Sequence, residues 1–547
     1  MNHNFSTVPS LKIPRSLFKR DHNLKTTINT DYIYPIYCDE ALPGDTFQFR
    51  QHLFARLNTP ITPIMDNLYL DTFFFAVPLR LVDDNFKKFM GERPFGDTST
   101  EYLVPQLESA NAISVGSLSD YLGLPIGVPN LKFSAYWHRA YNLIYNEFFR
   151  DENLCEPRPV AGKHYDGTVT TEALSDYVLC KRGKRHDYFT SCLPFAQKGD
   201  PVTIGLGNTA PVFGDGNVLR FSNGTTASYG LGTSATPGDV HTFNAGSTDM
   251  PISSTTVPAS TGLGRFGVSP KSLLPSGVTS GLIADLSNAS SVTINALREA
   301  FAIQSLLETD ARGGTRYIEI IRAHFGVVSP DARMQRPEYL GGNSEMIQIT
   351  TVPQSSSTNS VTPQGNLAAF GTFRNNAYWS HSFTEHCVII GLANVRADLS
   401  YQQGIPRMFS RRTRYDFYWP ELANLGEQAV LNKEIYAQGS NVLNANGTPV
   451  DDDAFGYQER WAEYRYHPNL ITGLFRSNTN LTLDYWHLAQ NFENLPTLNS
   501  TFIEEAVPID RVVALPDEPT VIMDGFFEVK CARPMPLFSI PGLGRRF

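Results

Sequence analysis

Two short segments combine several cations with aromatic side chains. One contains Lys181, Arg182, Lys184 and Arg185 followed by Tyr188 and Phe189, and the other contains Arg411, Arg412 and Arg414 followed by Tyr415 and Phe417. Such residues can neutralise the phosphates of single-stranded DNA and stack its bases without reading sequence. The same cations can instead pair with carboxylates inside a protein or across a subunit interface. We favour this second interpretation for both segments, because a phosphate contact requires exposed side chains.

A third basic stretch lies in residues 1–30. It has five cations against one acid, Asp21, and Pro9 and Pro14 limit helix formation in its first half. The five cations are Lys12, Arg15, Lys19, Arg20 and Lys25. We therefore predict an extended N-terminal arm over residues 1–30, and we regard these side chains as the better candidates for contact with DNA.

Patterns typical of nucleotide-binding or zinc enzymes are present in the wrong context. Residues 262–267 match the dinucleotide pattern G-x-G-x-x-G, and residues 205–210 match its looser form. Both lie in glycine-rich sequence rather than between a strand and a helix, where a dinucleotide would bind. The segment H-S-F-T-E-H at 381–386 has one residue too many for the zinc pattern H-x-x-E-H. We therefore predict no cofactor and no metal.

Two further groups of polar residues suggest hydrolysis or cation binding. His186 and Asp187 precede Ser191, but adjacent side chains diverge on a strand or helix and no nucleophile elbow surrounds the serine. Residues 451–453 are three consecutive aspartates that could bind a hard cation, but the spacing of an EF-hand is missing. We favour a solvated acidic loop, and the sequence predicts no catalytic residue.

The overall charge and the cysteines narrow the classes of function. The chain of 547 residues has a formal net charge of −9, which argues against a simple nucleic-acid-binding domain, so any DNA contact must be local. The six cysteines are scattered without a C-x-x-C pair, which predicts buried free thiols. No signal-like segment and no run of about 18 apolar residues occurs. We therefore expect no membrane insertion and folding in a reducing cytoplasm.

The elements that must position these residues are mainly strands, and they lie far apart in the sequence. Residues 45–57 begin with alternating polar and aromatic side chains, and residues 69–79 are a denser apolar run. Further strands are predicted at residues 346–352, 386–397 and 521–530. Because 41 glycines and 36 prolines punctuate the chain, we favour an all-β core with long loops over a helix bundle.

Two helices are predicted between these strands. The first is indicated by Trp137, Tyr141, Ile144 and Phe148, and the second by Leu297, Phe301, Leu306 and Leu307. In both sets the apolar residues recur at spacings of three and four, which is typical of one helix face. We expect both helices to pack against the core rather than to carry function.

The composition changes sharply at residues 199–292. This segment contains 15 of the 41 glycines and only eight charged residues, with Ser, Thr and Asn in place of large apolar residues. A segment of this composition cannot bury enough apolar surface to form a core of its own. We therefore predict a long surface insertion supported by its neighbours.

Several long blocks of the sequence resemble the major capsid proteins of gokushoviruses, which are small single-stranded DNA phages of the microvirus group. The blocks include residues 63–68, 148–154, 181–199, 311–342, 401–407, 418–430, 455–466, 486–492 and 539–543. They occur in the expected order and extend over nearly the whole chain. The longest is ARGGTRYIEIIRAHFGVVSPDARMQRPEYLGG at 311–342.

The resemblance implies a viral jelly roll, a sandwich or barrel of eight antiparallel strands with long loop insertions and a few short helices. It implies a discontinuous core of residues 31–198 and 293–533, an exterior protrusion at 199–292 and an extended tail at 534–547. It also implies self-assembly in the host cytoplasm into an icosahedral T=1 shell around circular single-stranded DNA, with small DNA-binding or scaffolding proteins as further partners. The host receptor is left open. The alternative class is a β-sandwich carbohydrate-active enzyme or lectin, although no pair of acids stands out as catalytic.

Overall fold

Two compact units make up the chain in this computed structural model. One consists of residues 1–198 and 307–547, and the other of residues 199–306. The structure describes residues 14–92, 102–109, 111–160, 171–203, 212–214, 219–222, 228–231, 282–284, 294–359 and 363–538. Within the second unit, β9 (Val212–Gly214) pairs with β12 (Leu282–Ala284), and β10 (Leu219–Ser222) pairs with β11 (Ser228–Leu231). Apart from these strands and residues 199–203, the predicted insertion up to residue 292 lies outside the described residues.

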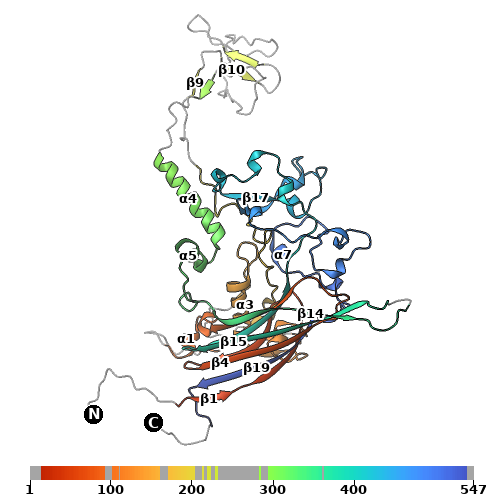
Figure 1. The fold of residues 1–547 in the computed structure, drawn as a ribbon. Helices are drawn as coiled ribbons and strands as arrows, with labels where there is room; N and C mark the ends of the chain where they lie inside the picture. The colour runs from red at the N-terminus through yellow and green to blue at the C-terminus, as the bar shows by residue number, and fades with distance from the viewer. Residues whose placement is uncertain are drawn as a thin grey trace, which may run out of the picture. The chain divides into compact units, whose positions relative to one another are not determined.

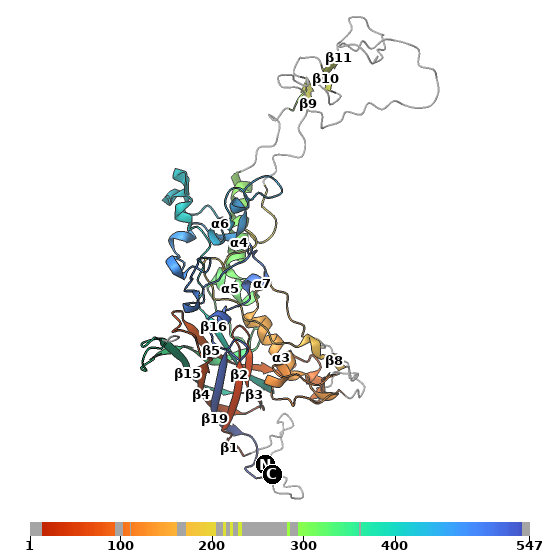
Figure 2. The ribbon, with the colours of Figure 1, turned by 90° about the vertical axis from the view of Figure 1, so that its right-hand side faces the viewer.

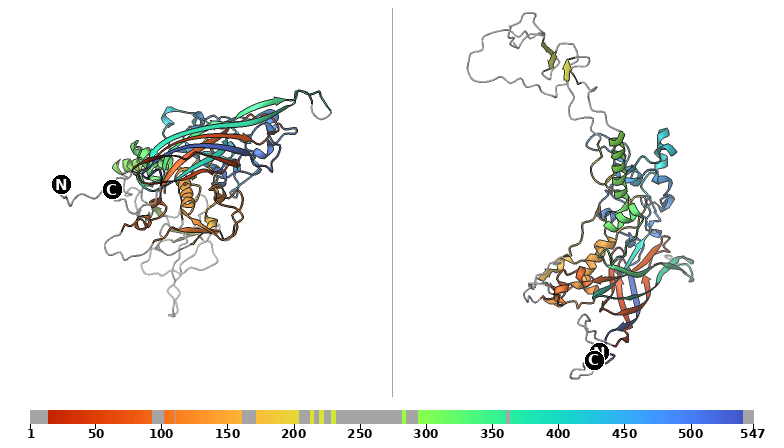
Figure 3. Two further views of the ribbon diagram at one scale, coloured as in Figure 1. Left: turned by 90° about the horizontal axis from the view of Figure 1, so that it is seen from below. Right: turned by 90° about the vertical axis from the view of Figure 1, so that its left-hand side faces the viewer.

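The first unit is built on a larger antiparallel sheet (Figure 1). Its strands are β1 (Ser16–Lys19), β2 (His22–Ile28), β19 (Val521–Arg533), β4 (Thr46–Leu57), β15 (Leu367–Ser382) and β14 (Gln348–Pro353). β19 lies between β4 on one side and β1 with β2 on the other. The β14–β15 hairpin projects beyond the other strands (Figures 1 and 3).

A smaller antiparallel sheet faces the larger one. Its strands, in spatial order, are β13 (Glu338–Met346), β5 (Leu68–Pro78), β16 (Cys387–Ala397) and β3 (Tyr34–Ala41). The chain alternates between the sheets, since β3 and β5 lie in the smaller one whereas β4 lies in the larger, and β15, β16 and β19 alternate in the same way. The predicted mainly β, jelly-roll sandwich is therefore confirmed.

Aromatic side chains fill the space between the two sheets. Phe49 of β4 lies 4.7 Å from Phe74 of β5, 5.0 Å from Trp379 of β15 and 5.8 Å from Phe527 of β19, measured between ring centroids. All four side chains are buried. The alternation predicted for residues 45–57 follows from this arrangement, because every second side chain of β4 enters the core and the others face away from it.

The smaller sheet is covered on its second face as well, by the helix α3 (Tyr136–Ile144) (Figure 2). Tyr141 of α3 is fully buried, donates its hydroxyl hydrogen to the backbone oxygen of Ile33 at 2.8 Å and accepts from the backbone N–H of Cys180 at 3.0 Å. Phe75 and Ile390 of the sheet pack in the same cluster. Burial of both faces explains why residues 69–79 form a dense apolar run, interrupted only by Asp71 and Thr72, rather than an alternating one.

Apart from α4, the remaining helices and strands are short. The helices are α1 (Phe86–Phe89), α2 (Leu118–Tyr121), α4 (Ile294–Gly313), α5 (Tyr317–Phe325), α6 (Asn432–Ile435) and α7 (Ser500–Ile503). The other strands are β6 (Gln106–Ser109), β7 (Leu131–Ser134), β8 (Thr171–Ala173), β17 (Glu427–Leu431) and β18 (Ala454–Glu459). α3 is a packing helix as predicted, whereas the described α4 buries only Ala311.

The N-terminal boundary of the sandwich differs from the prediction. Residues 16–28 were expected in an extended arm, but β1 and β2 pair along β19 from Arg533 to Val521. The sandwich therefore begins at Ser16 rather than at residue 31. The sequence obscured this because the segment is rich in charge, and its pairing partner is about 500 residues away in the chain.

Candidate functional site

Two of the N-terminal arginines are engaged within the sandwich. Arg20 donates from Nη1 to both carboxylate oxygens of Asp39 on β3, at 2.9 and 2.6 Å. Arg15 donates to the backbone oxygen of Gly44 and, at 2.9 Å, to the hydroxyl of Thr46. These contacts tie the first strands to the loop and strands beside them, so the two guanidinium groups serve the fold.

The N-terminal lysines are in a different situation. Lys19 contacts Asp21 at 2.9 Å and Lys25 contacts Asp524 at 3.2 Å, but their side chains are 72% and 79% exposed. Exposed pairs of this kind contribute little to stability and exchange readily with other partners. Both ammonium groups can therefore donate to a phosphate instead. Lys12 lies outside the described residues.

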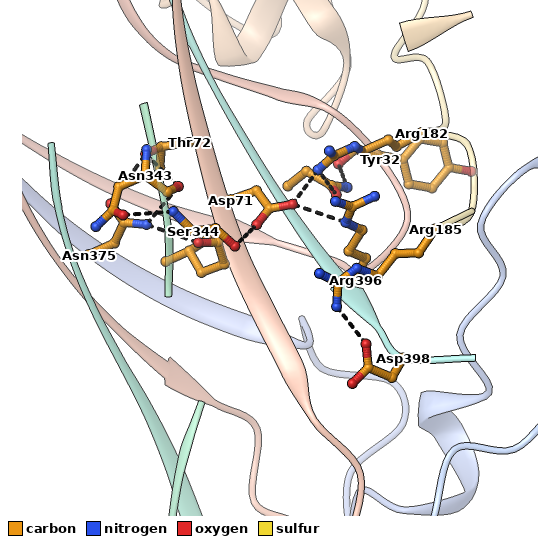
Figure 4. Close-up of polar contacts among 12 residues, drawn as sticks. Tyr32, Asp71, Thr72, Arg182, Arg185, Asn343, Ser344, Asn375, Arg396 and Asp398 are labelled. Atoms are coloured by element: carbon orange, nitrogen blue, oxygen red, sulfur yellow. Dashed lines mark hydrogen bonds and ion pairs between the residues drawn. The ribbon is translucent and has the colours of Figure 1, made fainter. Parts of the chain in front are cut away.

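Asp71 of β5 is the centre of a buried polar cluster (Figure 4). Its Oδ2 accepts from Arg182 at 2.5 Å and from Arg396 at 3.0 Å, while its Oδ1 accepts from the hydroxyl of Ser344. Burial acts to raise the pKa of Asp71, but the two guanidinium groups and the hydroxyl outweigh it, so the pKa lies below its ordinary value. The carboxylate is therefore charged, and it compensates two buried cations.

Arg185 and Lys184 also have partners within the subunit. Arg185 donates to Asp398 at 2.5 Å and stacks on the ring of Tyr69, 4.2 Å from its centroid. Lys184 is only 7% exposed and lies 4.6 Å from the ring centroid of Phe502, and burial lowers the pKa of its ammonium group. Lys184 is therefore packed inside the subunit, whereas Arg185, whose side chain is 35% exposed, is paired nearer the surface.

Backbone hydrogen bonds fix this basic segment between two distant parts of the chain. The N–H of Arg182 donates to the backbone oxygen of Asp31, and the N–H of Lys184 donates to that of Ile503, both at 2.8 Å. The N–H of Glu505 donates to the backbone oxygen of Arg182, also at 2.8 Å. The segment therefore links the chain before β3 to the segment after α7, which supports the predicted packing role over DNA contact.

Glu505 is the least compensated acid next to this segment. It is fully buried, and neither carboxylate oxygen has a hydrogen-bond partner among the described residues. Burial raises its pKa to about 7, and the nearby Asp31 acts in the same direction, against Lys184, Arg396 and Arg182. Burial likewise raises the pKa of Asp31 to about 6. The folded protein therefore holds a proton at this place more tightly than the unfolded chain does.

This raised pKa predicts a pH-dependent stability. The contribution is fully present below the ordinary carboxyl pKa and is lost as the pH rises through about 7. The Glu505→Gln variant has no carboxyl group to ionise, so its free energy of unfolding should not fall in this way. As the pH rises from 5 to 8, we expect the variant to gain stability relative to the parent, on the order of 3 kcal/mol. Thermal unfolding across this range measures the difference. The exposed Glu421→Gln substitution is the control, and a difference for Glu505→Gln that does not change with pH would contradict the prediction.

The second basic segment divides between buried and exposed side chains. Arg411 contacts Glu463 at 3.5 Å and lies 4.4 Å from the ring centroid of Tyr464, with its side chain 11% exposed. Arg412 and Arg414 are exposed. Arg411 therefore packs internally, whereas the other two remain available to a partner.

The residues considered for catalysis or cation binding have structural partners. Asp187 accepts from the N–H groups of Phe189 and Thr190, at 2.9 and 2.8 Å, and so shapes a turn. Asp451 accepts from the N–H groups of Gln438 and Gly439, at 2.9 and 2.8 Å. Within the described ranges, no three His, Cys, Asp or Glu side chains are placed to hold a metal ion. Both glycine patterns lie outside these ranges.

Two further predictions concern the cysteines and the possibility of a membrane-spanning helix. All six cysteines are free thiols, as predicted, and Cys180, Cys192, Cys387 and Cys531 are buried, whereas Cys38 and Cys155 are only partly buried. Among the helices that the structure describes, none is long and apolar enough to cross a membrane.

A set of exposed cations on the larger sheet was not predicted from the sequence. Arg50 and Arg56 of β4 and Arg374 of β15 point away from the core. The first two occupy alternate positions of a strand that was predicted, so that alternation was a usable signal. Arg374 lies in a strand that was not predicted.

Comparison with known proteins gives one consistent result. The family model described as "Capsid protein (F protein)" matches residues 6–543. The chain is similar to capsid protein VP1 of Chlamydia phage 1 and of Bdellovibrio phage phiMH2K, each 45% identical and covering 100% of this chain and 98% of the relative. It is also 37% identical to capsid protein VP1 of Spiroplasma virus 4, covering 99% of this chain and 98% of that protein.

Proposed function

Because the chain belongs to the capsid protein (F protein) family of the microviruses, we propose that its copies close into an icosahedral T=1 shell around a circular single-stranded DNA genome. The protein is a major capsid protein, and its place is the virion. Closed point-group symmetry allows one set of contacts to be repeated around the whole particle. An enzyme or lectin on the same sandwich is not supported, since the relatives are structural capsid proteins.

One surface segment carries this proposal. Between residues 408 and 425, several large apolar side chains are exposed in the isolated subunit. They include Phe409 at 72%, Tyr415 at 60% and Phe417 at 51%, with the exposed Arg414 among them. Aromatic residues, Met and Arg are the types enriched in protein interfaces. A neighbouring copy of the chain would cover this segment in the shell.

The segment is shaped before any neighbour arrives. Trp419 donates from its indole N–H to the backbone oxygen of Arg414 at 2.8 Å. Asp416 accepts from the backbone N–H groups of Arg412 and Thr413 at 2.8 and 2.7 Å, and these bonds hold the pKa of Asp416 below its ordinary value. A preformed surface loses less conformational entropy on binding. This favours an assembly contact over a flexible loop.

We expect the double variant Phe409→Ser and Phe417→Ser to form few or no shells, because two exposed rings no longer reach the neighbouring subunit. Negative-stain electron microscopy of the purified protein, expressed alone and with its neighbouring viral gene products, measures particle number. The variant Phe409→Leu and Phe417→Leu is the matched control, since it keeps apolar side chains and should assemble. Normal particle yield from the serine variant would count against this contact, and absence of shells from the parent under both conditions would count against the proposed function.

Three further parts of the proposal concern the particle. Residues 199–292, poor in large apolar side chains, would form an exterior protrusion that contributes to host attachment, since loops on a rigid scaffold often carry binding. Assembly would take place in the host cytoplasm, with small viral DNA-binding or scaffolding proteins as additional partners. Images of the parent particles would locate the protrusion.

A further inference from the structure

The larger sheet has one face in the core and one face open to solvent. In β4 the buried side chains alternate strictly with exposed ones, and β15 and β19 show the same alternation over most of their length. The open side is called the outer sheet face below, and β15, β4, β19 and β1 run side by side across it (Figure 1). Its chemistry decides what it can contact.

Cations predominate on the outer sheet face. They are Lys19, Lys25, Arg50, Arg56, Arg374 and Lys530, and all six are exposed. The carboxylates beside them are Asp21, Asp524 and Glu528, which contact Lys19, Lys25 and His52. Arg50, Arg56, Arg374 and Lys530 have no ion pair among the described residues. The face is thus positive on a chain whose formal net charge is −9.

Exposed rings are interleaved with these cations. Phe54 is 48% exposed, Phe526 is 38% exposed and Tyr378 is 60% exposed. Phe54 is the register partner of Arg374, and Tyr378 is the register partner of Arg50, whose guanidinium carbon lies 5.6 Å from the Tyr378 ring centroid. Aromatic side chains on an open sheet are the platform on which single-stranded nucleic acids stack their bases.

The register also places two like charges together. Lys19 of β1 and Lys530 of β19 are directly paired across the strands, and both are exposed. Like charges in directly opposite positions destabilise a sheet, and Asp21, which contacts Lys19 at 2.9 Å, is one carboxylate set against two ammonium groups. A further anion would add to this compensation, whereas a second cationic surface would increase the repulsion.

We propose that the outer sheet face binds the packaged single-stranded DNA. This inference rests on the proposed function and names the surface that contacts the genome. The cations would neutralise phosphates, and the rings would stack bases without reading sequence, as a genome of mixed sequence requires. Self-association of two such faces is disfavoured because both are positive. The N-terminal Lys19 and Lys25 lie at the edge of the same face, so one surface accounts for both sets of cations.

The binding test uses the purified full-length protein and a fluorescently labelled oligothymidylate, with anisotropy measured over a series of salt concentrations. For the double variant Arg56→Gln and Arg374→Gln we expect roughly tenfold weaker binding. Each lost phosphate contact should also reduce the slope of log affinity against log salt by about 0.7. For Phe54→Leu and Tyr378→Leu we expect roughly tenfold weaker binding with an unchanged salt slope, because stacking releases no counterions.

The matched control is the double variant Arg322→Gln and Arg333→Gln, which removes two exposed arginines away from the outer sheet face and should bind as the parent does. An equal loss in the control would overturn the proposal, since the binding would then reflect overall charge. Unchanged oligonucleotide binding by Arg56→Gln and Arg374→Gln together with a loss of shells would also overturn it, and would identify the face as a subunit contact. Failure of the proposed function is distinguishable, because it appears as absence of DNA-filled shells from the parent.

Discussion

Deletion of residues 534–547 is expected to abolish closed shells while leaving the sandwich folded. β19 ends at Arg533, whose guanidinium donates to the buried Asp45 at 2.9 Å. This contact holds the end of the last strand against the core. Beyond it, Leu537 is 57% exposed and Phe538 is 75% exposed, so these side chains have little to pack against within their own subunit. We therefore expect this segment to gain its apolar contacts from a neighbouring copy.

Particle number by electron microscopy and thermal unfolding of the unassembled protein test this expectation together. We expect the truncated protein to lose particles almost completely and to keep its unfolding midpoint. The variant Leu537→Met and Phe538→Leu, which retains apolar side chains, is the control and should assemble. Normal shells from the truncated protein would show that the tail is dispensable, and a lowered unfolding midpoint would show that it belongs to the subunit's own core.

Replacing Asp71→Ala is expected to lower the free energy of unfolding by about 3–5 kcal/mol. The substitution leaves Arg182 and Arg396 buried without the carboxylate that both contact. Removing one partner of a buried ionic cluster is costly because the remaining charges stay desolvated. Urea unfolding of the unassembled protein measures the change.

Two further variants separate charge from packing at this cluster. Asp524→Ala removes an exposed carboxylate paired with Lys25 and should change stability by less than about 1 kcal/mol. The triple variant Asp71→Leu, Arg182→Met and Arg396→Met removes all three charges and should recover much of the loss. If Asp71→Ala costs no more than Asp524→Ala, the cluster does not hold the basic segment in place.

The strands that local pattern could predict were those whose environment is uniform along their length. Residues 45–57 alternate because one face of β4 is buried, and residues 69–79 are densely apolar because β5 is covered on both sides. The strand predicted at 346–352 proved to be the end of β13 and most of β14, separated at the buried Ile347. The prediction there found the extended backbone but not the change of sheet.

The roles of the basic residues depended on partners that sequence does not reveal. Arg182 donates to Asp71, 111 positions earlier in the chain, and Arg185 donates to Asp398, 213 positions later. Proximity in the sequence therefore gave no indication of either pair. The outer sheet face could be recognised only once the strand register was known, because Arg374 lies beside Phe54 only when β15 is aligned with β4. Aromatic neighbours in the sequence were therefore a poor guide to exposed stacking partners.

The position of β19 in the larger sheet has a consequence for synthesis on the ribosome. This strand lies late in the chain, yet it pairs with β4 on one side and with β1 and β2 on the other. The three earlier strands therefore lack this pairing partner during almost the entire time of translation. A nascent chain that stops early has an open edge on β4 and no finished sandwich. We therefore expect incomplete products to be unable to join a shell, so that completion of the last strand limits assembly to whole subunits.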